Sequence, residues 1–292
     1  MTLFFLKAVA FVLGCLPRGL TLPLGRALGR LVCRLDKKRA LVARENIRRA
    51  FPEMADAEVD RIASEVFANL GAMLFEFMRI PWLGKGSLGP LVEFEGMEHF
   101  TRAAQKNKGV ILVTAHFGNW ELMAAAVGMF IHPVDIVARD LDHPALEEFV
   151  SWVRQRAGNR IVSKSRAMRK LLKSLSNGGV VGILLDQNVA RREGVFVDFF
   201  STPACTNKGP ALLAAASGAP MVPIFNVPEG NGYRIIIQEE IEMAMTGDKE
   251  QDAVTNTARC TEAIEQMIRA HPEQWFWVHR RWKTRPLKEK KP

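Results

Sequence analysis

The chain has 292 residues, of which 48% are hydrophobic and 24% charged, and its formal net charge is +9. This length and composition predict a folded chain with a sizeable core rather than a disordered one. The four cysteines (Cys15, Cys33, Cys205 and Cys260) show neither CxxC nor zinc-ligand spacing. We therefore expect reduced thiols, and neither a disulfide nor a metal site.

The positive charge is concentrated at the two ends of the chain. Residues 1–50 carry a net charge of +9 and residues 279–292 a net charge of +6, whereas residues 51–278 carry −6. Basic ends are typical of proteins that bind nucleic acid or an anionic membrane surface. Because the chain has a single tyrosine and no nucleic-acid recognition motif, the sequence favours the membrane surface and predicts no nucleic-acid partner.

Two apolar stretches, 3–16 and 20–35, begin the chain, and Arg26, Arg30 and Arg34 recur in the second at helical spacing. Neither stretch supplies the roughly 18 uninterrupted apolar residues of a transmembrane helix. We expect a membrane-embedded hairpin or interfacial amphipathic helices with snorkelling cations. A cleaved signal peptide is the alternative. The predicted domains are therefore a basic, apolar, membrane-associating segment over 1–50 and an α/β domain over 51–292 with a basic C-terminal tail.

The remaining elements follow in chain order. A basic helix is predicted over 37–51, and apolar residues at 3.6-residue spacing predict another over 56–78. From residue 92 strands alternate with helices, which indicates an α/β fold with a mixed, largely parallel sheet flanked by helices. The predicted strands are 109–115, 134–139, 161–163, 180–186, 221–225 and 233–239. The predicted helices are 120–130, 144–157, 165–176 and 252–270, with a loop that extends to about residue 207 and a helix from there to residue 217.

A histidine and a glutamate follow the strand predicted over 109–115. Asn119 is a good N-cap for the helix that begins at Trp120, so His116 lies in the strand-to-helix turn, where open α/β sheets place their sites. We expect the Glu121 carboxylate to hold the imidazole of His116, which makes His116 a general base for an alcohol. The alternative from spacing alone is a structural histidine with an unrelated surface glutamate.

Three further polar residues lie near the ends of other predicted strands. Arg139 follows one strand, Asp186 follows another, and Arg154 lies on the helix between them. Convergent arginines favour a phosphorylated substrate, because guanidinium groups bind phosphate bidentately. Taken singly, each arginine is better explained by a solvated helix face or a structural ion pair.

Five segments, taken in order, carry a family resemblance. They are 116–121 (HFGNWE), 182–188 (GILLDQN), 195–200 (VFVDFF) with 203–206 (PACT), 218–225 (GAPMVPIF) and 272–286 (PEQWFWVHRRWKTRP). Together they resemble the lipid A biosynthesis lauroyl/myristoyl acyltransferases, within the lysophospholipid acyltransferase superfamily. The HX4E motif alone marks the superfamily, whereas the ordered set is specific to this branch. The FPEGTR block of glycerophosphate acyltransferases is absent, and REGVFVD stands in the comparable region.

The resemblance implies a glycerolipid acyltransferase-like fold and an enzyme on the cytoplasmic face of the inner membrane. The enzyme would move a fatty acyl chain from acyl carrier protein to a hydroxyl of a phosphorylated glycolipid, without a metal or bound cofactor. His116 would be the base and Glu121 its orienting partner, while Arg139, Arg154 and Asp186 would bind substrate. We expect backbone N–H groups around residues 117–119 to stabilise the oxyanion. The basic ends would serve acyl carrier protein, the phosphorylated lipid and the anionic membrane surface.

Two other functions fit the sequence. The nearer one keeps the chemistry but acts on another glycolipid or on a lysophospholipid, and coenzyme A is an alternative thioester donor. The more distant one is a noncatalytic lipid-binding or scaffolding membrane protein in which the histidine and glutamate are structural. Acyl length depends on an apolar pocket whose lining the sequence does not identify.

Overall fold

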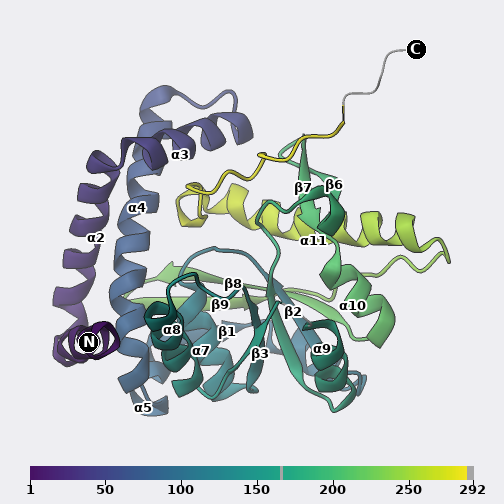
Figure 1. Cartoon of the computed structure of the whole chain (residues 1–292), viewed down its shortest axis with the longest axis horizontal. Helices are drawn as coiled ribbons and strands as arrows, with labels where there is room; N and C mark the ends of the chain where they lie inside the picture. The colour runs from purple at the N-terminus through teal and green to yellow at the C-terminus, as the bar shows by residue number, and fades with distance from the viewer. Residues whose placement is uncertain (165–166, 288–292) are drawn as a thin grey trace.

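A seven-stranded sheet forms the centre of the computed structural model, which describes residues 1–164 and 167–287 (Figure 1). The strand order is β1-β9-β8-β2-β5-β3-β4. Neighbouring strands run parallel, except β8 and β9, which are antiparallel. The predicted fold class, a mixed and largely parallel sheet flanked by helices, is confirmed.

The strands of this sheet alternate with helices along most of the chain. The strands are β1 (Val92–Glu95), β2 (Val110–Thr114), β3 (Val134–Ala138), β4 (Arg160–Ser163), β5 (Val180–Leu184), β8 (Met221–Glu229) and β9 (Gly232–Ile237). The helices after residue 90 are α6 (Met97–Ala104), α7 (Trp120–Phe130), α8 (Pro144–Arg156), α9 (Ala167–Ser176), α10 (Gly209–Ser217) and α11 (Lys249–Ala270). The first two residues of the helix predicted over 165–176 lie outside the described residues. Strand β1 and helix α6 were not predicted, because both are short.

Apolar clusters cover the two faces of the sheet, and β2 contributes to both. All five residues of β2 are buried, as the unbroken apolar run predicts. Ile111 and Val113 pack in a cluster with Ile264 of α11, whereas Val110 and Leu112 pack with Leu122 of α7. Figure 1 shows α11 across one face of the sheet and α7 and α8 against the other. The carboxyl end of β2 therefore lies between two packed layers of helices.

The predicted loop is wrong between residues 194 and 207, where an antiparallel hairpin forms from β6 (Gly194–Phe199) and β7 (Thr202–Asn207). Two-residue turns of this kind place both residues at positive φ, and sequences usually mark them with Asn-Gly. Here Phe200 and Ser201 take φ values of 52° and 53°. Because neither residue is a typical turn former, the sequence carries no hairpin signal.

The first two helices, α1 (Thr2–Cys15) and α2 (Arg18–Leu35), belong to a helical layer beside the sheet, with α2 along α4 (Asp56–Arg79) (Figure 1). Glycines allow this approach, since a Cβ on Gly29 would lie 1.9 Å from the Phe67 carbonyl oxygen. Leu20, Leu24, Leu28, Leu31 and Leu35 of α2 are exposed. None of the helices described within 1–164 and 167–287 combines the length and apolarity needed to cross a membrane.

Helix α3 (Lys37–Ala50) joins this layer to the rest of the molecule. Ala43 and Ile47 of α3 pack in one apolar cluster with Val59 and Ile62 of α4 and with residues of the sheet. The packing is therefore continuous across residue 50. The division into a segment over 1–50 and a domain over 51–292 stays a prediction.

Gly29→Ala is expected to lower the melting temperature by several degrees, because the new methyl group meets the Phe67 carbonyl. Overpacking of this kind costs about 1–3 kcal/mol. Thermal unfolding followed by circular dichroism measures the effect. Gly19→Ala, on the same helix but with open space at its Cβ, is the control and should leave the melting temperature unchanged or slightly raised. Equal melting temperatures for Gly29→Ala and the unmodified protein would contradict the close packing of α2 on α4.

Candidate active site

His116 lies just beyond the carboxyl end of β2, and Asp186 lies at the equivalent point beyond β5. The two strands are parallel neighbours with Thr114 opposite Leu184, so the residues two positions further on meet side by side. The Nδ1 atom of His116 is 2.8 Å from Oδ1 of Asp186. The backbone N–H of His116 donates to Oδ2 of the same carboxylate at 3.0 Å. The imidazole is thus held by Asp186.

Asp186 is buried, with 3% of its surface exposed. Its Oδ2 also accepts a hydrogen bond from the Trp275 indole N–H at 2.8 Å. Burial alone raises the pKa of a carboxyl, but His116 and the Trp275 indole outweigh it and hold the pKa of Asp186 below its usual range. An ionised Asp186 can accept a hydrogen bond from Nδ1–H of His116, and Nε2 is then the ring nitrogen that can act as a base.

The expectation that Glu121 holds the imidazole differs from the structure. The Glu121 carboxylate instead accepts two hydrogen bonds from Arg154 of α8, at 3.0 Å from Nε and 2.6 Å from Nη2. This bidentate pair holds the pKa of Arg154 above its usual range, although burial alone lowers it. Asp186 was expected to bind substrate, but it is buried behind His116. Both residues of the sequence motif, His116 and Glu121, line one cleft.

The turn that carries His116 depends on a glycine and on the C-terminal segment. Gly118 has φ +57°, and a Cβ there would lie 1.9 Å from the Asn226 carbonyl oxygen, so a larger residue does not fit. The Gly118 N–H donates to the carbonyl of Gln274, and the Phe276 N–H donates to the carbonyl of His116. Residues 274–276 therefore pair with the turn and deliver Trp275 to Asp186.

A cleft of about 770 Å³ opens in front of His116. Apolar residues of α4, including Leu74 and Phe77, form one side of it, while Arg139 and Arg154 are among its polar residues. The Arg139 side chain is 77% exposed and pairs with Asp142, so it lies at the rim. The lining of the cleft is therefore mixed, with apolar residues of α4 on one side and charged residues among the rest.

A smaller recess of about 50 Å³ lies behind the Glu121–Arg154 pair. It shares Trp120, Glu121, Ile136, Arg154 and Leu184 with the cleft. The rest of its lining, between α7 and the sheet, is apolar except for Thr114: Leu112, Met123, Ala124, Val127, Val134, Gly182 and Ile224. The recess therefore extends the cleft into the apolar core.

Three side chains at the site were not singled out from the sequence. Trp275 donates a hydrogen bond to Asp186. The Gln187 amide nitrogen lies 3.3 Å from Nε2 of His116. Nε2 of His279 accepts a hydrogen bond from the Asn188 N–H at 3.0 Å. Burial, with Arg281 and His116, lowers the pKa of His279, so its imidazole is neutral near pH 7. These residues lie in the segments 182–188 and 272–286, which carry the family resemblance but gave none of the three a role.

Two of the backbone N–H groups expected to stabilise an oxyanion already donate hydrogen bonds within the protein. The Phe117 N–H donates to Ala115 and the Gly118 N–H to Gln274. The expectation is therefore wrong for these two residues. The side-chain amide of Gln187 is a polar group on the open side of the imidazole.

Comparison with known proteins shows the family of this chain. The family model for bacterial lipid A biosynthesis acyltransferase matches residues 1–284. The chain belongs to this acyltransferase family. It is 32% identical to the lipid A biosynthesis lauroyltransferase of Escherichia coli (strain K12) over 274 residues, which are 93% of this chain and 88% of the relative.

Other members of the family differ in the acyl group that their names give. The chain is 29% identical to the lipid A biosynthesis palmitoleoyltransferase of Escherichia coli (strain K12), covering 91% of this chain and 86% of the relative. It is 26% identical to the myristoyltransferase of the same organism, covering 92% and 83%. The resemblance seen in the sequence and the enzyme type, a lipid A biosynthesis acyltransferase, are confirmed. Because the three identities are similar, family membership alone does not select one acyl group.

Proposed function

We propose that this protein transfers a fatty acyl chain from a thioester to a hydroxyl group of a lipid A precursor, with His116 as the general base and Asp186 as its orienting partner. The observation that carries the proposal is the contact between Nδ1 of His116 and Oδ1 of Asp186 at 2.8 Å, at the head of the cleft. Family membership supplies the class of reaction.

The proposed reaction proceeds by direct attack of the acceptor alcohol. Nε2 of His116 removes the proton from the hydroxyl as its oxygen attacks the thioester carbonyl carbon. Asp186 stabilises the resulting imidazolium through Nδ1–H. The tetrahedral intermediate then collapses to the ester and expels the thiolate, which takes the proton from the imidazolium. The Gln187 amide, 3.3 Å from Nε2 of His116, would donate to the developing oxyanion once the substrates are bound.

The Glu121–Arg154 pair and Arg139 are proposed to bind the substrates rather than to move the proton. Arg154 is largely buried and held in one orientation by Glu121, so its guanidinium is preorganised beside the path into the recess. Arg139 lies at the rim, where it would contact a phosphate of the lipid acceptor.

Acyl carrier protein is the proposed donor, and a basic surface beside the site supports it. Lys38, Arg39, Arg280 and Lys283 line a surface hollow together with His279, which also lines the cleft. An acidic carrier that docks on these cations would place its thioester near His116. Acyl-coenzyme A is the alternative donor that the assay below distinguishes.

The N-terminal helices are proposed to hold the enzyme on the cytoplasmic face of the inner membrane. Phe4, Phe5 and Phe11 of α1 are exposed, as are leucines along α2. Exposed apolar side chains beside Arg and Lys residues are typical of helices that lie in a membrane interface. Helix α4 forms one wall of the cleft, and α2 packs on the same helix. Membrane binding through α2 would therefore bring the cleft close to the lipid acceptor.

Mass spectrometry of membrane lipids from cells with and without this chain tests the proposed function. Lipid A precursors should gain the mass of one acyl group when the chain is expressed, and His116→Ala should lower this product at least about 10³-fold. His143→Ala, which changes an exposed histidine, is the control and should retain the product.

Purified protein with acyl carrier protein or coenzyme A thioesters, and with lipid A precursor or lysophospholipid acceptors, separates the alternatives. Acylation of lysophospholipid alone would reject the proposed acceptor. A lipid-dependent effect of the chain that is unchanged by His116→Ala, without acyl transfer, would instead support a noncatalytic lipid-binding protein.

Gly182→Ala is expected to shorten the acyl chain that the enzyme prefers. A Cβ at Gly182, which lines the recess, would lie 2.9 Å from Cγ1 of Val134 and take up part of this small volume. One methylene more or less in an apolar pocket changes selectivity by about 10-fold or more. Competition between thioesters of different chain length, read by mass spectrometry, measures the shift. Gly86→Ala, which has open space, should leave the preference unchanged, and an unchanged preference in Gly182→Ala would exclude the recess as the acyl site.

A further inference from the structure

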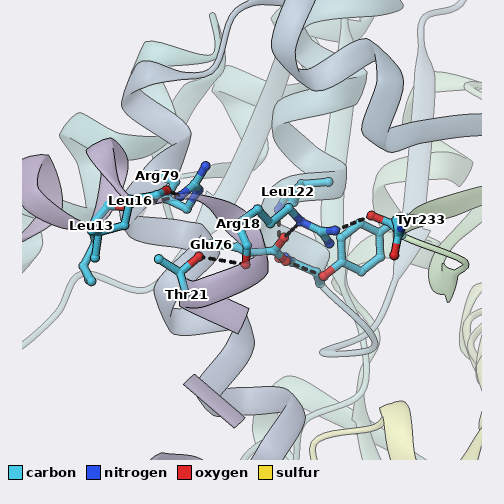
Figure 2. Close-up of polar contacts among 10 residues, drawn as sticks. Leu13, Leu16, Arg18, Thr21, Glu76, Arg79, Leu122 and Tyr233 are labelled. Atoms are coloured by element: carbon cyan, nitrogen blue, oxygen red, sulfur yellow. Dashed lines mark hydrogen bonds and ion pairs between the residues drawn. The ribbon is translucent and has the colours of Figure 1, made fainter. Parts of the chain in front are cut away.

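A carboxylate on α4, outside the residues that line the cleft, connects the N-terminal helices to the catalytic turn. Glu76 is 2% exposed. Its Oε1 accepts a hydrogen bond from Nε of Arg18 at 2.7 Å, and its Oε2 accepts one from Nδ2 of Asn119 at 2.7 Å. The Tyr233 hydroxyl donates to the same Oε2. Figure 2 shows the Arg18 and Tyr233 side chains directed at Glu76.

The chemistry of this cluster calls for a carboxylate. Arg18, Asn119 and Tyr233 all present donors, and an ionised carboxyl has acceptors only. Burial alone lowers the pKa of Arg18, but Glu76 outweighs it and holds the pKa above its usual range. Burial and Glu76 raise the pKa of Tyr233, so its hydroxyl stays a donor. An amide at position 76 would direct an N–H group at these donors.

Asn119 transmits this arrangement to the site. It is 2% exposed and lies in the turn between His116 and Glu121. Its Oδ1 accepts a hydrogen bond from the Leu122 N–H at 3.1 Å and so caps α7. Its backbone carbonyl accepts a hydrogen bond from Nδ2 of Asn226 at 2.9 Å. Because the amide donates to Glu76 through Nδ2, its oxygen faces the helix. Glu76 therefore sets the orientation of the cap that starts the helix carrying Glu121.

Arg18 brings the N-terminal helices into the same cluster. It is the first residue of α2, and its guanidinium also donates to the carbonyl of Asn231. Close by, Arg79 of α4 donates to the carbonyls of Leu13 and Leu16, at the end of α1 (Figure 2). The junction of α1 and α2 is thus attached to α4 beside Glu76.

We propose that Glu76 is a positioning residue for the turn from His116 to Glu121, and that Arg18 makes this turn depend on the docking of α2. The inference rests on the proposed acyl transfer. Glu76 acts through Asn119, and does not itself contact the substrates. A displacement of about 1 Å at a catalytic group costs up to roughly 100-fold in rate. The loss of the Glu76 carboxylate is therefore expected to lower kcat rather than to weaken substrate binding.

Glu76→Gln is the first test. We expect kcat for acyl transfer to fall by about 10-fold to 100-fold, with KM for the thioester changed less than about threefold. Hydrogen exchange read by mass spectrometry should show faster exchange in peptides that cover residues 117–124. Glu58→Gln is the matched control, since Glu58 lies on the same helix but pairs within that helix, with Arg61. It should keep kcat and leave exchange over 117–124 unchanged.

Asn119→Ser keeps the test decisive if Glu76→Gln does not fold. Serine still caps α7 but is too short to reach Glu76. It should reproduce the lower kcat and the local increase in exchange.

The outcomes separate the two proposals. If the unmodified protein transfers no acyl group, the proposed function fails, and the exchange experiment alone judges the role of Glu76. An unchanged kcat in Glu76→Gln, or in Asn119→Ser where Glu76→Gln does not fold, overturns the inference. So does an increase in exchange spread evenly over the chain, because that pattern marks general destabilisation.

Discussion

Asp186 is an ionised carboxylate that is almost completely buried from solvent, and the arrangement of the site depends on it. Removing a carboxylate from water is costly unless donors replace the water. Here the imidazole, the backbone N–H of His116 and the Trp275 indole supply those donors. Asp186 in turn fixes the position of the imidazole by accepting hydrogen bonds from both the ring and the backbone of His116. The other ring nitrogen, Nε2, lies 3.3 Å from the Gln187 amide nitrogen, and both residues line the cleft.

Three parts of the chain that are distant in sequence meet at this contact, and a fourth supports the turn that carries His116. Parallel pairing of β2 and β5 brings His116 beside Asp186. The C-terminal segment returns to the turn after β2 and places Trp275 against the carboxylate. Helix α4 adds Glu76, which holds Asn119 in the same turn. The site is therefore built on rigid elements and has several independent supports, as the proposed acyl transfer requires.

The sequence was sufficient for those features that depend on local pattern. Helix α7 was predicted with the bounds that the structure shows, because Asn119 caps it and an apolar run precedes it. The hairpin over 194–207 was missed, because Phe200 and Ser201 are unusual turn residues. The partner of His116 was assigned to Glu121 by spacing, whereas the structure gives Asp186. That choice depends on the register of β2 against β5, and spacing along the chain carries no information about register.

A double-mutant cycle on His116 and Asp186 tests the central claim most directly. The rate of acyl transfer is measured for His116→Ala, Asp186→Asn and the double variant. If Asp186 acts through the imidazole, each single variant should lose roughly 10³-fold or more, and the double variant should be no slower than His116→Ala alone. A near-normal rate in Asp186→Asn, or losses that multiply in the double variant, would contradict the assignment of Asp186 as the partner of His116.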